Sequence, residues 1–130
     1  MEKENPVEEA QRYVDNAKTI LKEHGELDTK TKRYGDRKYV RMAGNTLWNG
    51  MLVILEAVFK VKANKTKGRP DIIDYRKAIG DRNKKLLDIV NDAYDNMHLY
   101  MGYDGNLDKN ISDGAFNSAT LVIRLCSAML

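Results

Sequence analysis

The stretch VRMAGNTLWNGMLVILEAVF, residues 40–59, decides the fold that we expect for this chain. Apolar residues recur along it at helical spacing, and its second half is apolar nearly all round, which is typical of a helix buried among others. Asp36 stands just before it and is suited to cap a helix, so we predict a helix over residues 36–62. At about 1.5 Å per residue such a helix is roughly 40 Å long. We expect it to lie at the centre of a helical bundle.

Four further segments carry helical patterns of apolar residues. Pro6 suits the first position of a helix and Gly25 supplies a stop, and between them an apolar stripe recurs at three- and four-residue spacing. The later patterns are separated by a basic loop that ends in Pro70 and by a polar loop after Met101. The predicted helices cover residues 6–24, 71–79, 81–101 and 113–130. The chain is therefore expected to be a single all-α domain over residues 1–130, an antiparallel four-helix up-and-down bundle with one extra short helix.

Length and composition favour an ordinary globular domain. The chain has 130 residues, of which 42% are hydrophobic and 32% charged, and a domain of this size can bury a core without metals or disulfides. The single cysteine, Cys126, lies in an apolar run and is expected to be buried. The first ten residues are acidic and polar, unlike a secretory signal, and no run approaches the 18 or so apolar residues of a membrane span. We expect a cytoplasmic protein without a membrane partner.

Polar residues interrupt the apolar central helix and have two interpretations. Glu56 lies within LVILEAVF, where a buried carboxylate is costly unless it is paired, for example with an arginine or with His98. Such a set can form a pocket for a small polar ligand, or an internal network that fixes helix register or a dimer contact. The candidate residues are Arg41, Asn45, Asn49, Glu56, Tyr94 and His98. We favour the structural interpretation.

The positive charge is concentrated in one part of the sequence. The net charge is only +3, but residues 31–70 carry ten lysines and arginines against two acidic residues. The loop after the central helix therefore has a surface that can attract an anionic partner, although such runs are more often solvated connections. Its candidate anion-binding residues are Lys62, Lys65, Lys67 and Arg69. Few aromatic residues lie among the lysines, so the stacking of bases is poorly supported there.

Metal, cofactor and catalytic motifs are weak or missing. Asp95 stands three residues before His98 and is expected to hydrogen-bond to it, but a metal site would need further ligands and none is evident. The loop from Asp104 begins like a calcium-binding EF-hand but has Lys109 where the turn glycine belongs and Ala115 in place of the bidentate glutamate. Glycine-rich phosphate loops are absent. We predict no metal, no cofactor and no catalytic residue.

Two glycines in the central helix suggest close packing. Gly44 and Gly50 each cost about 1 kcal/mol of helix stability against alanine. We therefore expect another backbone to approach them closely, either from this chain or from a second subunit.

The order of the helices resembles a known family. The amphipathic segment AQRYVDNAKTILKE, followed by DRKYVRMAGNTLWNGMLVILEA and a bundle closure, resembles HEPN-like domains (higher eukaryote and prokaryote nucleotide-binding). The resemblance implies a helical bundle that pairs as a homodimer. Many members are metal-independent ribonucleases or accessory partners of nucleotidyltransferases in toxin–antitoxin systems.

The ribonuclease motif of that family is missing from this sequence. Active members carry an arginine followed by four to six residues and a histidine near the start of a late helix. Here the arginines that precede His24 and His98 most closely are Arg12 and Arg82, which lie much farther away. We therefore predict a non-catalytic HEPN-like binding or accessory module that recognises a nucleotide, a nucleic acid or a partner protein. The alternatives are a purely structural homodimeric interaction protein and, more remotely, a metal-independent ribonuclease.

Overall fold

The protein is all-helical in the part of the chain that the structure, a computed structural model, describes: residues 4–63 and 68–130. Five α-helices and one π-helical segment are found there, and the only bridges of β type are isolated pairs in the loops. The elements are α1 (Pro6–His24), α2 (Arg37–Phe59), α3 (Ile72–Gly80), α4 (Lys84–Ala93), the π-helix η1 (Tyr94–Tyr103) and α5 (Lys109–Ser127).

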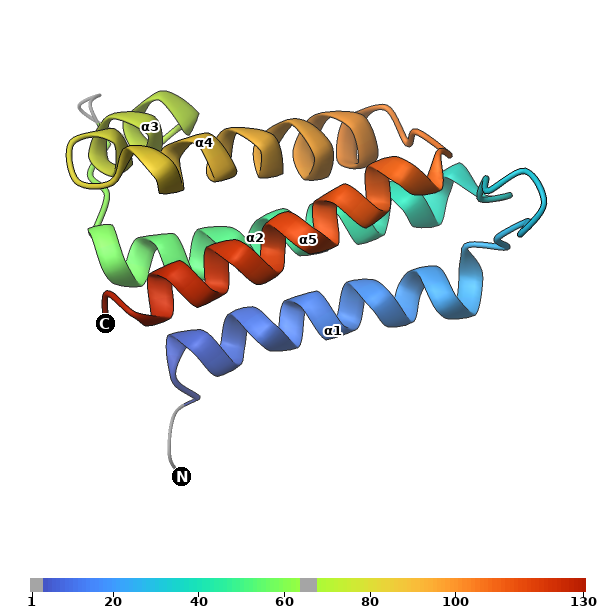
Figure 1. Ribbon diagram of the computed structural model, residues 1–130, viewed down its shortest axis with the longest axis horizontal. Coiled ribbons are helices and arrows are strands. Elements are labelled where there is room, and N and C mark those ends of the chain that lie inside the picture. The colour runs from blue at the N-terminus through green and yellow to red at the C-terminus, as the bar shows by residue number, and fades with distance from the viewer. Residues whose placement is uncertain (1–3, 64–67) are drawn as a thin grey trace.

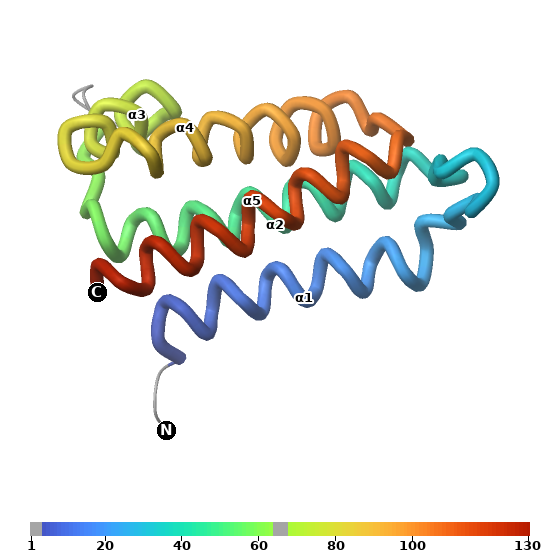
Figure 2. Tube along the Cα trace, in the orientation of Figure 1, coloured from blue at the N-terminus to red at the C-terminus, as the bar shows by residue number. Residues whose placement is uncertain are grey.

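The long helices lie alongside one another, and successive ones run in opposite directions (Figure 1). The short helix α3 packs beside the beginning of α4, at the end of the molecule where α2 finishes. The trace in Figure 2 shows α4 and η1 as one continuous helical path that returns along α2. Helix α2 contacts α1, η1 and α5, which places it in the middle of the assembly.

The core forms around the tryptophan-bearing helix because its apolar residues occupy most of its circumference. Leu47, Met51, Ile54 and Leu55 are completely buried, and Trp48 is nearly so. They join one hydrophobic cluster with buried residues from the other helices, such as the stripe of α1 that was expected from its spacing.

Helix α2 also has the length and mean hydropathy of a membrane span, by composition alone. The sequence analysis expected no run that approaches the 18 or so apolar residues of a membrane span, and this helix differs from that expectation. The reason is that mean hydropathy is an average: the strongly apolar residues of LVILEAVF offset the two asparagines and Glu56, which interrupt any continuous apolar run. A core helix of a globular protein meets the same criterion, and 44% of the stretch is buried within this protein.

Capping residues explain where several helices begin and end. The side chain of Asp36 accepts from the backbone N–H of Lys38, so α2 begins as predicted. The helix ends at Phe59 rather than at residue 62, because Lys60 takes a left-handed conformation with φ 49°. The backbone N–H of Lys60 donates to the backbone carbonyl of Glu56.

The helices α4 and α5 begin at other residues than those predicted. Asn83 accepts from the N–H of Leu86, so α4 starts later than residue 81. Asp108 accepts from the N–H of Asn110, so α5 starts four residues before residue 113. In both places a nearby polar side chain caps the helix and sets its first residue.

Close approaches of backbones occur at both glycines of α2, and both are within this chain. A Cβ atom on Gly44 would lie 2.5 Å from the carbonyl oxygen of Met97 and 2.7 Å from the backbone nitrogen of Gly102 in η1. A Cβ atom on Gly50 would lie 2.7 Å from Cβ of Tyr13 in α1. Gly44 therefore allows α2 to pack closely against η1, and Gly50 allows it to pack closely against α1.

The segment predicted as the second half of a single α-helix is instead π-helical. The expected helix 81–101 becomes α4 followed by η1, a ten-residue π-helix. Ala93, Met97 and Met101 are all completely buried although they are spaced four residues apart. The hydrogen bonds of a π-helix run from residue i to residue i+5, so its turn is wider than the 3.6 residues of an α-helix. π-Helical turns are rare and occur frequently at functional sites.

Candidate functional site

The polar residues predicted to act together are divided between two places. Arg41 and Asn45 lie on the flank of α2 that faces the end of η1. Nε of Arg41 donates to the carbonyl of Tyr103 at 3.2 Å, and the amide of Asn45 donates to the carbonyl of Gly102 at 3.4 Å. Arg37, one turn earlier, donates to the carbonyl of Asp104 at 3.2 Å.

These three hydrogen bonds supply donors to backbone carbonyls at the end of η1. The last carbonyls of a helix have no partner within the helix and need donors from elsewhere. Residues 37, 41 and 45 are spaced by four, so their side chains reach three successive carbonyls of the neighbouring segment. On this side the polar residues of α2 hold the end of η1 in place.

Asn49 and Glu56 take no part in such a network. Both side chains are exposed, and neither has a hydrogen bond or ion pair within residues 4–63 and 68–130. The expected burial of Glu56 is therefore wrong. Its position on α2 faces solvent near the helix end, although its neighbours Ile54 and Leu55 are buried.

Tyr94 and His98 belong to an aromatic cluster with Trp48. The rings of Tyr94 and His98 stack with centroids 5.1 Å apart, as their four-residue separation on η1 allows. Trp48 meets the ring of Tyr94 edge-on at 5.3 Å and that of His98 at 6.2 Å. The guanidinium of Arg76 lies over the ring of Tyr94, 5.4 Å from its centroid, and its Nε donates to Asn91 at 2.8 Å.

This aromatic cluster lines a hollow of about 290 Å³, which we call the aromatic hollow. Its walls come from α2, η1, α3 and the residues that lead into α3. They are Trp48, Leu52, Pro70, Asp71, Ile72, Tyr75, Tyr94 and His98. Four of these eight side chains are aromatic rings, if the imidazole is included, so the hollow can accept a flat ligand by stacking.

An imidazole nitrogen at this hollow has no partner. Nδ1 of His98 is buried and forms no hydrogen bond with any described residue, so it does not make the expected donation to Asp95. Leaving a buried polar atom unpaired costs about 1–3 kcal/mol. Such an atom in a native structure calls for an explanation, and a ligand that supplies the missing bond is one.

Tyr75 gives the hollow a second polar group. Burial raises the pKa of its hydroxyl, and the negative charge of Glu56 raises it further. Tyr75 therefore stays protonated well into the alkaline range and can donate or accept a hydrogen bond at neutral pH. The sequence analysis did not single out Tyr75, because the short helix that carries it shows only a general amphipathic pattern.

The predicted anion-binding residues are not gathered into one site within the described chain. Lys62 lines a different hollow together with Lys77 and two aspartates, Asp74 and Asp81, which offset its charge. Arg69 is exposed and precedes Pro70, which lines the aromatic hollow. Lys65 and Lys67 lie outside the described residues.

Nucleophile and metal chemistry find little support in this site. Cys126 is completely buried, and burial raises the pKa of its thiol to about 11, so the reactive thiolate is scarce at neutral pH. Among residues 4–63 and 68–130, no three His, Cys, Asp or Glu side chains converge in a way that could hold a metal ion. What the hollow offers is a surface for binding.

Comparison with known proteins places the chain in a family. Residues 5–128 match the family described as Domain of unknown function (DUF5618). The chain belongs to this family. It is also similar to a solved structure, a protein of unknown function from Dyadobacter fermentans, with 37% sequence identity, a TM-score of 0.86 and 96% of each chain covered. No curated protein matches the sequence.

Proposed function

We propose that the protein is a non-catalytic binding module with a HEPN-like fold, and that its ligand site is the aromatic hollow. The observation that carries this proposal is the buried, unpaired Nδ1 of His98 beside the rings of Trp48 and Tyr94. Evolution does not keep an unpaired buried polar atom for stability, since an apolar side chain of similar size would be cheaper there. A ligand that bonds to it explains why it is present.

The fold supports the family resemblance at the level of helix order. The four long helical paths alternate in direction with α3 as an additional short helix, and we assign them to an up-and-down four-helix bundle (Figure 1). The proposal includes the homodimer and the cytoplasmic setting that the resemblance and the sequence favour. Exposed Met42 on α2 and exposed Tyr100 and Tyr103 on η1 supply apolar surface for a second copy.

The ligand class that fits the hollow best is a nucleotide. A nucleobase can stack on an aromatic ring, and stacking is worth about 1–3 kcal/mol per base. Nδ1 of His98 is closed off from solvent in the unliganded structure, so the imidazole must turn toward the hollow before an N–H or amino group of the base can donate to it. The hydroxyl of Tyr75 is a second partner for the base. Arg76, above Tyr94, and Arg69, next to Pro70, carry the positive charge for a phosphate.

The chain contains a built-in reporter for this site. Trp48 is its only tryptophan, so a ligand that enters the hollow changes the whole tryptophan emission of the protein. We expect one of the four ribonucleoside monophosphates to quench this emission with a single saturable binding curve. At 100 times its dissociation constant it stabilises the fold by about 2.7 kcal/mol, which raises the melting temperature by roughly 10 °C.

The two histidines provide a matched pair of variants. We expect His98→Ala to abolish both the quenching and the thermal shift, and His24→Ala to leave both unchanged, since His24 is exposed on α1 and stacks on Tyr39. Equal responses of the two variants, or no response of the wild-type protein to any of the four nucleotides, would reject the aromatic hollow as a nucleotide site.

A structural homodimeric interaction protein is the second candidate. The bonds from Arg41 and Asn45 to the end of η1 favour it, because they show polar residues of α2 used to hold one segment in place. In that case light scattering finds a dimer, nucleotides give no thermal shift, and Tyr103→Glu shifts the protein to a monomer. Cleavage of RNA that is lost in His98→Ala would instead support the ribonuclease alternative.

A further inference from the structure

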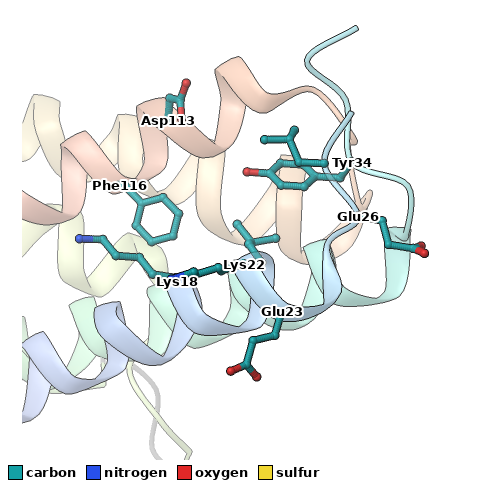
Figure 3. Close-up of a pocket in the computed structure, with 9 residues that line it drawn as sticks. Lys18, Lys22, Glu23, Glu26, Tyr34, Asp113 and Phe116 are labelled. Carbon is teal, nitrogen blue, oxygen red and sulfur yellow. The ribbon is translucent and has the colours of Figure 1, made fainter. Parts of the chain in front are cut away.

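A second hollow lies away from the aromatic hollow and shares no residue with it. It has a volume of about 500 Å³ and lies between the last turns of α1, the connection to α2 and the first turns of α5 (Figure 3). We call it the α1–α5 hollow. Its apolar side chains are Leu21, Leu27, Tyr34 and Phe116.

Tyr34 is a fixed wall of this hollow. Its side chain is only 8% exposed, and its hydroxyl is 2.9 Å from Oγ of Ser112 in α5, which in turn donates to the carbonyl of Lys109 at 2.9 Å. The backbone N–H of Tyr34 donates to the carbonyl of Leu107 at 2.9 Å. The aromatic ring is thus held from both ends, and a ligand does not have to order it.

Phe116 and Leu27 leave apolar surface open to solvent next to this wall. Phe116 is half-buried, and Leu27 is 37% exposed in the connection after α1. Figure 3 shows the rings of Phe116 and Tyr34 on either side of a common space. A flat apolar group placed between them removes this surface from water, which is favourable by about 25 cal/mol per Å².

Two lysines and three acidic residues line the hollow. Asp113 is paired with Lys109 at 2.7 Å, and in Figure 3 the carboxylates of Glu23 and Glu26 point away from the space between the rings. Lys18 and Lys22, one turn apart on α1, are exposed and have no ion pair within the described chain. Nζ of Lys18 lies 5.8 Å from the centroid of Phe116, and in Figure 3 it is directed past Phe116, away from Tyr34. Because both lysine side chains are long and exposed, their ammonium groups can turn toward a ligand in the hollow.

We propose that the α1–α5 hollow binds a small amphipathic anion, with a flat apolar body between Tyr34 and Phe116 and a single anionic group at Lys18 and Lys22. Two ammonium groups on one helix face suit a carboxylate, sulfonate or phosphate. The apolar walls select against small inorganic anions, which gain nothing from them. This site is independent of the nucleotide site proposed above.

Two probes of matched shape test the two halves of this proposal. The sulfonated dye 8-anilino-1-naphthalenesulfonate and its uncharged analogue N-phenyl-1-naphthylamine share the flat body and differ in the anionic group. We expect the sulfonate to bind the folded protein at one site, about tenfold more tightly than the analogue at low ionic strength. The difference should shrink as salt is added.

Variants with equal change of charge locate the anionic contact. Lys18→Gln with Lys22→Gln is expected to weaken binding of the sulfonate about tenfold and that of the analogue less than twofold. The control is Lys84→Gln with Lys85→Gln, a pair of exposed lysines at the start of α4, which should change neither. Leu27→Glu, an exposed position, should weaken both probes, because it removes apolar wall and adds a like charge.

The result that overturns the proposal is equal weakening of the sulfonate by the two lysine pairs, since binding would then depend only on net charge. Loss of probe binding in His98→Leu would also overturn it, because the dye would then occupy the aromatic hollow. If nucleotides fail to bind while the dye responds to Lys18 and Lys22 as expected, the proposed function fails and the α1–α5 hollow stands.

Discussion

The two ends of the π-helix η1 treat their polar groups in opposite ways. At its C-terminal end, Arg41 and Asn45 of α2 donate to the carbonyls of Tyr103 and Gly102, so groups that the helix leaves unpaired find partners. In its N-terminal half, Nδ1 of His98 is buried beside Trp48 and has no hydrogen-bond partner among the residues that the structure describes. The hydrogen bonds at the C-terminal end stabilise the fold, whereas the unpaired nitrogen in the N-terminal half destabilises it.

The difference teaches where binding is to be sought. A polar side chain whose hydrogen bonds are all made within the fold has none left for a ligand, whatever its position in the sequence indicates. A buried polar atom without a partner keeps that capacity at a cost to stability, which is the usual pattern of a functional site.

Replacing Gly44 by alanine should break the contact on which both ends of η1 depend. The new Cβ atom would lie 2.5 Å from the carbonyl oxygen of Met97 and from Cβ of Met101, so the two helices must move apart. We expect a loss of about 2 kcal/mol in the free energy of unfolding, even though alanine favours a helix by about 1 kcal/mol. Urea denaturation measures it. Asn49→Ala, an exposed change in the same helix, is the control, and a Gly44→Ala protein as stable as that control would show that the helices are not in close contact.

Removing the donors at the C-terminal end should cost less. We expect Arg41→Ala to lower the free energy of unfolding by about 1 kcal/mol, because the carbonyl of Tyr103 loses its partner. Asn45→Ala should cost less than that, since its bond of 3.4 Å is long. Thermal unfolding and nucleotide titration measured on the same samples test the comparison. Loss of nucleotide binding in either variant without loss of stability would mean that these residues serve the ligand after all.

Replacing the unpaired histidine should leave stability unchanged or raise it slightly. His98→Leu removes a buried polar atom without a partner and keeps much of the apolar volume, so we expect a change between zero and a gain of about 1 kcal/mol. Nucleotide binding should be lost at the same time. His98→Gln, which keeps polar atoms, is the companion variant. A destabilised His98→Leu protein would reveal that the imidazole is satisfied and would remove the contrast between the two ends.

The smallest effect concerns the ionisation of Tyr75. Because Glu56 adds to the effect of burial, Glu56→Gln should lower the pKa of Tyr75, while burial still keeps it above the ordinary value. The pKa of Tyr75 is measured by titrating tyrosinate absorbance in the wild-type and Glu56→Gln proteins. In each case the curve of the same protein with Tyr75→Phe is subtracted, which leaves the contribution of Tyr75 alone. A raised pKa also means that the unfolded chain ionises first, so Tyr75 lowers stability as the pH rises above about 10. An unchanged titration in Glu56→Gln would place the carboxylate too far from the hollow to matter.

Prediction from the sequence succeeded where local pattern and burial agree. The helical class, the central position of residues 40–59 and the buried stripe of α1 follow from apolar spacing, which is the strongest signal that a single sequence carries. Helix ends were less accurate, as at Asn83 and Asp108, because several nearby residues can cap a helix equally well. Glu56 was misplaced because apolar neighbours in sequence do not guarantee apolar neighbours in space.

The site was predictable only in part. Tyr94 and His98 were among the candidate residues of the predicted pocket or network, and they line a hollow. Arg41 and Asn45 were grouped with them because all are polar and share helical spacing. Their actual partners lie 62 and 57 residues away, at carbonyls that no side-chain pattern reveals.

What the sequence determined by itself is which segments are helical and which faces of them are apolar, since both depend on residues within a few turns of each other. Only the tertiary structure decided which polar atoms are satisfied. Gly44 lets α2 approach η1 so closely that Arg41 and Asn45 reach its last carbonyls, while His98 stacks on the ring of Tyr94 beside Trp48. Hydrogen bonds depend on distances of a few tenths of an ångström between distant parts of the chain, and these are set by packing.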